Sequence, residues 1–133
     1  MEKIIVRPME EKDINDVLDI FSDISDTDKD FLVWDYKSDD IIQEIENIEH
    51  CHVAEIDGEV VGLLIQLDWK LGYSLLDTLV VHPDYRGLGV ASKMLDYYHK
   101  KFPKSTAKVE KENKTMQGLL KKYGYEPFQW MRD

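Results

Sequence analysis

A glycine-rich turn between an apolar run and an amphipathic stretch constrains this chain more than any other feature of its sequence. The apolar run is Leu75–Val81, the turn reads Arg86-Gly87-Leu88-Gly89-Val90-Ala91, and the amphipathic stretch covers Ser92–Phe102. This pattern predicts a strand that enters a tight turn and continues into a helix. Gly87 and Gly89 lack a Cβ, so they can take positive φ and let backbone N–H groups converge on an anion at the positive end of the helix. With an arginine at its start, the turn therefore predicts a phosphate-binding site.

Length and composition predict a single globular domain. A chain of 133 residues is long enough for one compact core, so we expect one domain over residues 1–133. No segment approaches the ~20 continuous apolar residues that a membrane span needs. The first residues have only three consecutive apolar positions before Arg7 and Pro8 and lack a secretory signal, so a cytoplasmic location is expected. Cys51 is the only cysteine, which excludes an intrachain disulfide, and no ligand spacing predicts a metal site.

The net charge of −10 limits the partners that the chain attracts. An acidic protein repels nucleic acids and anionic membranes and attracts cationic small molecules or basic peptides. Aspartates gather between residues 23 and 40, and lysines gather between residues 100 and 122. One interpretation is two solvated faces of opposite sign. The other is an acidic mouth for an amine and a basic end for an anion.

Hydrophobic periodicity and turn signals predict a mixed α/β fold. Asp57-Gly58 lies between two apolar runs and favours a hairpin with a two-residue turn, and Gly124 suits the position after a helix end. Ser25–Lys37 is expected to be a loop. The expected elements are strands Lys3–Pro8, Cys51–Ile56, Glu59–Trp69, Tyr73–Val81, Ser105–Glu110 and Tyr125–Met131, and helices Asp13–Ile24, one capped by Ser38 and carrying Ile48, Ser92–Phe102 and Lys114–Tyr123. The order β-α-α-β-β-β-α-β-α-β combines hairpins with crossovers and predicts a mixed sheet.

The glycine turn alone does not identify the phosphate compound, because such cradles serve nucleotides, dinucleotides and coenzyme A. A P-loop requires Gly-Lys followed by Ser or Thr, which is absent here. A dinucleotide fingerprint requires a third glycine at the position of Ser92. The sequence around the turn is therefore needed to identify the phosphate compound.

The stretch resembles the central signature of the GNAT superfamily of acyl-CoA-dependent N-acetyltransferases, Arg/Gln-x-x-Gly-x-Gly/Ala at a strand-to-helix turn. Arg86, Gly89 and Ala91 match this signature in register. Further similarity lies in Leu79–Gly89, Val61-Gly62, Asn113 and Tyr123-Gly124-Tyr125, so that the resemblance covers nearly the whole chain. It implies a GNAT-type fold, with a mixed, mostly antiparallel central sheet flanked by helices, and acetyl-CoA as the cofactor.

The resemblance also implies where acetyl-CoA binds. The pyrophosphate would lie against the backbone amides of the turn, and the strand before it would pair its main chain with the pantetheine arm, as an added strand would. Asn113 would bind the arm or its phosphates, or cap the next helix. The implied cofactor-binding residues are Leu79, Val80, Val81, Arg86, Gly87, Leu88, Gly89, Val90, Ala91, Ser92 and Asn113.

Acetyl transfer requires a neutral amine, and deprotonating a lysine-type amine with a pKa of ~10.4 at pH 7 costs about 4.6 kcal/mol. Strand alternation places Asp77 on the same face as Leu79 and opposite Leu76. We assign Asp77 as the candidate general base, acting through a water, with a hydrogen-bonded strand aspartate as the alternative interpretation. Asp68 and Glu55 are weaker candidates.

The general acid that is usual in the family is missing. Many members protonate the leaving thiolate with a tyrosine four residues before a glycine, but Leu120 stands at that distance from Gly124. Tyr123, on the same helical face, is the substitute candidate, and packing beside the helix end is its alternative role. In the acidic segment, Trp34 and Tyr36 are candidates to bind a cationic acceptor through cation–π contacts.

Three functions are consistent with these residues. The first is transfer of an acetyl group from acetyl-CoA to a primary amine of a small molecule or peptide by direct attack. The second is an acyl-CoA-binding or sensing module with weak or no catalysis, which Leu120 favours, and the third is an unrelated nucleotide-binding domain. The last expected strand leaves a sheet edge that a second copy can cover, as in a homodimer.

Overall fold

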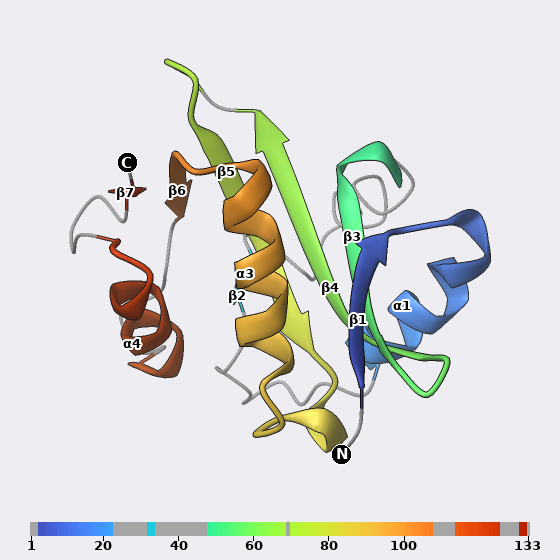
Figure 1. Cartoon of the computed structure of the whole chain (residues 1–133). Helices are drawn as coiled ribbons and strands as arrows, with labels where there is room; N and C mark the ends of the chain where they lie inside the picture. The colour runs from blue at the N-terminus through green and yellow to red at the C-terminus, as the bar shows by residue number, and fades with distance from the viewer. Residues whose placement is uncertain are drawn as a thin grey trace.

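The chain folds into one mixed sheet with helices on both faces (Figure 1). A computed structural model describes residues 3–22, 32–33, 48–68, 70–107, 114–125 and 131–132. The strands are β1 Ile4–Pro8, β2 Leu32–Val33, β3 Cys51–Ile56, β4 Glu59–Asp68, β5 Ser74–Val81, β6 Ser105–Ala107 and β7 Met131–Arg132. The helices are α1 Ile14–Ser22, α3 Val90–Lys101 and α4 Lys114–Lys122, with short 3-10 turns η1 Glu11–Asp13, η2 Ile48–His50 and η3 Pro83–Tyr85.

The sheet is mostly antiparallel. Its strand order is β1-β3-β4-β5-β6-β7, and β2 pairs with β5 away from that path. Only β5 and β6 run parallel among the described pairs, because α3 connects them as a crossover. The mixed, mostly antiparallel sheet flanked by helices that the sequence and its family resemblance predict is therefore confirmed.

Two apolar clusters fill the space between the sheet and its helices. On one face, Val17 and Ile20 of α1 pack with Leu63, Ile65 and other residues of the sheet. On the other face, α3 and α4 pack over Leu64, Leu76 and Leu79, contributing Met94, Leu95 and Leu120. Helix α3 passes close to Gly62, where a Cβ would come within 2.9 Å of the Met94 Sδ. This glycine therefore sets how closely the helix and its N-terminus approach the sheet.

The turns explain why the hairpin prediction was correct. Asp57 and Gly58 have φ of 51° and 83°, the two positive values that a two-residue primed turn requires. Leu71 and Gly72 repeat this geometry before β5, with φ of 61° and 79°. The first turn joins β3 to β4 and the second joins β4 to β5, and the twist of both suits an antiparallel pair.

The structure corrects the predicted elements at β2 and at Tyr125. The segment expected to be a loop, Ser25–Lys37, contributes the short strand β2 to the sheet. The expected strand from Tyr125 begins too early, because Tyr125 closes the end of α4 with its N–H donating to the Leu120 carbonyl at 3.1 Å, and it is buried in the core. The helix expected after Ser38 lies outside the described residues. No described helix is long and apolar enough to cross a bilayer.

Candidate cofactor-binding and catalytic site

The glycine turn leaves open space in front of the first backbone amides of α3. Gly87 and Gly89 have φ of 82° and 86°, and a Cβ at either position would meet no atom within 4 Å. Gly89 is the N-cap of α3, and without a side chain it satisfies none of the first N–H groups of the helix. Leu88, between the two glycines, is also exposed. We call the turn from Arg86 to Ala91 the cradle, because a helix N-terminus with open space at two glycines suits the binding of a phosphate.

Hydrogen bonds brace this turn against the sheet. Arg86 does not only add charge at the rim, because its Nε donates to the Val81 carbonyl at 3.1 Å and ties the turn to the end of β5. The His82 N–H donates to the Val61 carbonyl at 2.8 Å, and the Tyr85 hydroxyl donates to Glu59 Oε2 at 2.6 Å. The cradle is thus held by three contacts with residues of β4 and β5.

Strand β5 is shared between three neighbours. β4 pairs with it along one edge from Ser74 to Val81. On the other edge, the described residues of β6 pair with Ser74–Leu76, and β2 pairs with Thr78 and Leu79. The described part of β5 is therefore paired with β4 on one edge, and with β6 and β2 on the other.

A buried chain of hydroxyl groups clamps the paired end of β5 and β6. The Tyr98 hydroxyl donates to Ser74 Oγ at 2.7 Å and lies 2.9 Å from Ser105 Oγ, which accepts from the Tyr125 hydroxyl at 2.8 Å. His99 Nε2 lies 2.7 Å from that same Tyr125 hydroxyl. Each hydroxyl has one proton, so Ser105 donates to Tyr98 and His99 donates to Tyr125. Burial also raises the pKa of Tyr98, which keeps its hydroxyl protonated.

Asp77 lies in a β-bulge in the middle of β5. Ile65 pairs with Thr78, whereas the next residue on β4, Gln66, pairs with Leu76, so Asp77 is the extra residue on its strand. Its side chain is 6% exposed, and Oδ2 accepts a hydrogen bond from Thr78 Oγ1 at 3.0 Å. The simple alternation that the sequence predicts is wrong here, because the bulge puts Leu76 and Leu79 into the same core cluster.

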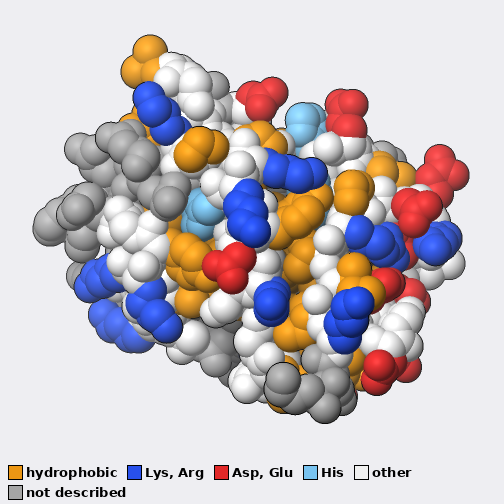
Figure 2. Space-filling model, viewed as in Figure 1, with side chains coloured by type: hydrophobic (Ala, Val, Ile, Leu, Met, Phe, Trp, Pro, Cys, Tyr) orange, Lys and Arg blue, Asp and Glu red, His pale blue; other side chains and the backbone are white. Residues whose placement is uncertain are grey.

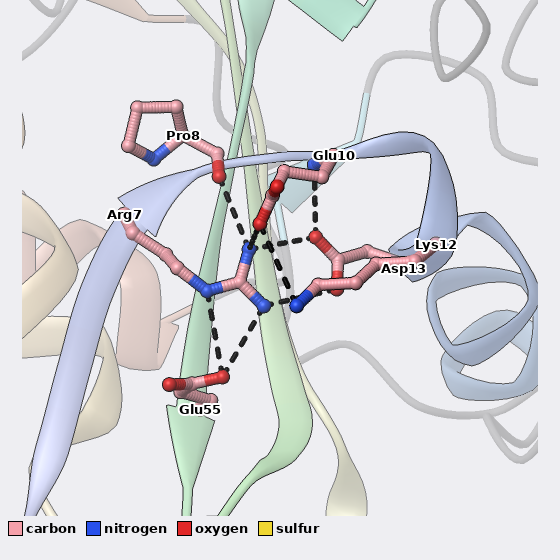
Figure 3. A network of polar contacts seen from close by, with 6 residues as sticks. All are labelled: Arg7, Pro8, Glu10, Lys12, Asp13 and Glu55. Carbon is pink, nitrogen blue, oxygen red and sulfur yellow. Dashed lines mark hydrogen bonds and ion pairs between the residues drawn. The ribbon is translucent and has the colours of Figure 1, made fainter.

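The two weaker carboxylate candidates lie elsewhere. Glu55 faces β1, where its Oε2 accepts from Arg7 Nη2 at 3.2 Å, and Arg7 also forms a two-pronged ion pair with Asp13 (Figure 3). The Arg7 hydrogen bonds hold the pKa of the buried Asp13 carboxyl below its usual range. Asp68 is exposed at the end of β4 and accepts from Gln66 Nε2 at 3.1 Å. These contacts favour Asp77 over both.

The helix α4 offers no hydroxyl at the usual acid position. Leu120 is fully buried in the core beneath α3 and α4. The Tyr123 hydroxyl donates toward Asp96 Oδ1 at 2.8 Å and the Ser92 carbonyl at 3.0 Å, both on α3. Burial and the Asp96 carboxylate raise the pKa of Tyr123 to about 12. In the described contacts, Tyr123 therefore anchors the end of α4 to α3.

Three predicted site residues, Trp34, Tyr36 and Asn113, lie outside the described residues. The face that carries α3 and α4 displays many Lys and Arg side chains (Figure 2). Exposed lysines on these two helices are Lys93, Lys100, Lys101, Lys114, Lys121 and Lys122. A basic face beside the cradle favours an anionic ligand although the whole chain is acidic. Sequence reasoning missed Thr78, Ser74 and Ser105, and the only signal for them was a hydroxyl residue inside or at the start of an apolar strand.

A buried central strand with a bulge leads into a turn with two left-handed glycines and a helix N-terminus without a side-chain cap. The chain belongs to the acetyltransferase (GNAT) family, whose model matches residues 14–125. This family transfers acetyl groups and uses acetyl-CoA as its cofactor.

Solved structures share the fold. The chain is similar to Ard1 from Thermoplasma volcanium, with 22% identity over 92% of this chain and 82% of that one and a TM-score of 0.75. It is also similar to the ribosomal-protein-S18-alanine N-acetyltransferase from Escherichia coli, with 14% identity, coverage of 93% and 78%, and a TM-score of 0.74. A third is the diaminobutyrate acetyltransferase EctA from Paenibacillus lautus, in complex with L-2,4-diaminobutyric acid and coenzyme A, with 17% identity, coverage of 92% and 77%, and a TM-score of 0.68. At these identities the likeness establishes the fold.

Proposed function

We propose that the chain transfers an acetyl group from acetyl-CoA to a primary amine of a small molecule or peptide by direct attack of the amine nitrogen. One arrangement carries this proposal: the phosphate cradle at Gly87 and Gly89 stands at the end of the strand whose middle holds the buried carboxylate Asp77. A cofactor anchored at the cradle and extended back along β5 would bring its acyl end toward Asp77.

The residues present fit this cofactor. The amides from Arg86 to Ser92 would hold the pyrophosphate, and the open space at the two glycines admits it. The backbone of Leu79, Val80 and Val81 would pair with the pantetheine arm, and Asn113 would contact the same arm or its phosphates. When bound, acetyl-CoA supplies an acetyl thioester with a good leaving group. The side chains of Leu79 and Val81 remain in the core, so only their backbone serves the cofactor.

Asp77 would act as the general base. A protonated amine loses one proton to Asp77, through a water, before the nitrogen bonds to the acetyl carbon and the C–S bond breaks. The second amine proton ends on the departing sulfur. Thr78 holds Asp77 Oδ2 and leaves the other carboxylate oxygen for this task.

As general acid, Tyr123 would relay this proton, giving its own proton to the sulfur and taking up the amine proton, only after its bond to Asp96 opens. With its pKa raised to about 12, this hydroxyl is a weak acid compared with a thiol of pKa ~8.5. A thiolate of that basicity leaves without an acid at moderate rates, so the chemistry tolerates a slow or absent acid. A Tyr123→Phe variant decides: loss of kcat with unchanged affinity for acetyl-CoA supports an acid, and unchanged kcat supports the anchor.

The acceptor that we propose is cationic. The net charge of −10 attracts a protonated amine, and Trp34 and Tyr36 in the acidic segment would bind it through their rings. The similar structures belong to enzymes with different acceptors, since one is named for an alanine of a ribosomal protein and another is bound to diaminobutyric acid. The proposal therefore stops at the class of primary amines.

The fully buried Leu120 also favours a second candidate, an acyl-CoA-binding module with weak or no catalysis. The two candidates share the cradle and differ in turnover. Thermal shift with acetyl-CoA, ATP and NAD tests the cradle first, because only acetyl-CoA should stabilise the chain. Thiol release is then followed across polyamines, aminoglycosides, amino acids and basic peptides. Stabilisation without release on any amine would reject the enzyme and keep the module.

The role of Asp77 has a matched control in Asp68. Asp77→Asn should lower kcat by ~10²–10⁴-fold, the usual effect of removing a general base, and leave acetyl-CoA affinity unchanged. Asp68→Asn removes an exposed carboxylate from the neighbouring strand and should change neither. Equal activity of the two variants would reject Asp77 as the base.

A further inference from the structure

The proposed pantetheine arm must pair with the edge of β5 that faces away from β4. Other strands of the chain already occupy part of this edge. β4 occupies one edge of β5 from Ser74 to Val81, so every other partner must lie on the opposite edge. There β6 pairs with Ser74–Leu76, and β2 pairs with Thr78 and Leu79. β2 is antiparallel to β5, with Leu32 opposite Leu79 and Val33 opposite Thr78.

This position overlaps with the proposed cofactor ledge. The pantetheine arm would pair with Leu79, Val80 and Val81 on that same edge, and Leu79 is already a partner of Leu32. Val80 and Val81 lie between this pair and the cradle. A ligand anchored at the cradle therefore reaches Val81 first, and the main chain of β2 lies between it and Asp77.

We propose that β2 and the pantetheine arm of acetyl-CoA compete for this edge of β5, so that cofactor binding displaces Leu32–Val33. The inference rests on the proposed function, because it needs the arm to run along β5. Each backbone N–H and C=O on the strand edge makes its ladder bond with one partner strand, and two partners cannot share one register position.

The size of β2 suits a displaceable strand. It has two residues, and successive pairs in an antiparallel ladder alternate between bonded and non-bonded, so few backbone bonds hold it. A longer strand would exclude the arm altogether. Competition of this kind reduces the apparent affinity for acetyl-CoA by the fraction of molecules in which the edge is open.

A disulfide that locks β2 tests the competition. Val33 and Thr78 are register partners, and antiparallel partners have Cα atoms ~4.5–5.5 Å apart, within the range that a disulfide spans. The variant combines Val33→Cys and Thr78→Cys with Cys51→Ala, which removes the buried native thiol. The dissociation constant for acetyl-CoA is measured on the oxidised and reduced forms of this one polypeptide, so effects of the substitutions themselves cancel.

Oxidation should raise the dissociation constant for acetyl-CoA by at least ~30-fold, and dithiothreitol should restore it. The disulfide holds β2 on β5, so very few molecules have the edge open for the pantetheine arm. Val33→Cys with Cys51→Ala and native Thr78 is the control, and oxidant should leave its affinity unchanged. Equal affinities of the oxidised and reduced double-cysteine variant would overturn the competition. So would failure of the two cysteines to bond, which mass spectrometry after alkylation detects.

A second variant acts in the opposite direction. Val33→Pro removes a backbone donor from β2 and weakens its pairing, so acetyl-CoA should bind roughly 3-fold or more tightly if pairing limits the open fraction. Unchanged affinity together with an unresponsive disulfide variant would reject the inference and leave the proposed function intact. If the unaltered chain itself fails to bind acetyl-CoA, the proposed function is rejected, and the inference with it.

Discussion

Replacing a left-handed glycine of the cradle tests its role in binding acetyl-CoA separately from its role in the stability of the fold. Gly89 has a φ of 86° and no atom within 4 Å of the place where a Cβ would stand. An alanine there would clash with nothing in the chain, so its cost is backbone strain of about 1–2 kcal/mol. Its methyl group would, however, fill the space through which a pyrophosphate approaches the backbone. We therefore expect Gly89→Ala to abolish acetyl-CoA binding and to leave the chain folded.

Gly58 provides a matched control. It has a φ of 83°, nothing within 4 Å of its missing Cβ, and a position in the β3–β4 turn, away from α3. Gly58→Ala should cost the same strain, and at this chain length each kcal/mol lowers Tm by roughly 4 °C. Both variants should therefore melt about 4–8 °C below the unaltered chain.

The assay is thermal unfolding with and without acetyl-CoA. A ligand at 100 times its dissociation constant stabilises the folded state by about 2.7 kcal/mol, so the unaltered chain and Gly58→Ala should gain roughly 10 °C. Gly89→Ala should gain nothing. An equal gain for both alanine variants would refute the assignment of the cradle, because the same strain would then have left the phosphate site intact.

Three further perturbations have expected outcomes that follow from burial. Burial lowers the pKa of His52 from 6.5 to about 4, so between these pH values the unfolded chain binds a proton that the folded chain does not. The stability due to neutral His52 is therefore complete above pH 6.5 and is lost as pH falls toward 4. In urea unfolding across that window, the free energy of unfolding should fall less steeply for His52→Gln than for the unaltered chain. Leu120→Tyr places a larger side chain at a fully buried position and should destabilise the fold by about 1–3 kcal/mol without raising kcat. As a control of similar volume, Leu120→Met should cost less than about 1.5 kcal/mol. An unchanged Tm together with a higher kcat for Leu120→Tyr would show that a hydroxyl at this position reaches the sulfur. Ser105→Ala removes the hydroxyl between Tyr98 and Tyr125 and should lower the free energy of unfolding by about 1–3 kcal/mol. Ser22→Ala, at the exposed end of α1, is the control and should change it by no more than about 0.5 kcal/mol. Equal losses for the two variants in chemical denaturation would contradict the role of the buried hydroxyl chain.

Local sequence signals predicted the turns and their positive φ values well, because single residues decide them. Asp57-Gly58 and the two glycines of the cradle take positive φ, which few other residues adopt cheaply. The long helix after the cradle was also predicted, although it begins at Val90, two residues before Ser92. At the turn positions with positive φ, the residue type alone predicts the backbone conformation.

Pairing between distant segments was not predictable in the same way. β2 lies in an acidic segment without clear periodicity, and its strand partner β5 is far away in the sequence. Glu55 was a weaker candidate for the general base, and nothing in the local sequence indicated its ion pair with Arg7 of β1. Both outcomes depend on which strands become neighbours, and that information is spread over the whole sheet.

The bulge at Asp77 shows how one extra residue changes the chemistry of a strand. Regular alternation would put Leu76 and Leu79 on opposite faces, yet both are buried in the core beneath α3. Two residues, Asp77 and Thr78, lie between them, so the bulge lets both leucines keep the same face. The register change also falls beside Leu76, which pairs with Ala107 of β6 in the described part of the chain. The bulge therefore places a buried carboxylate in the middle of the strand that leads into the glycine turn, which is where the proposed acetyl transfer requires a base.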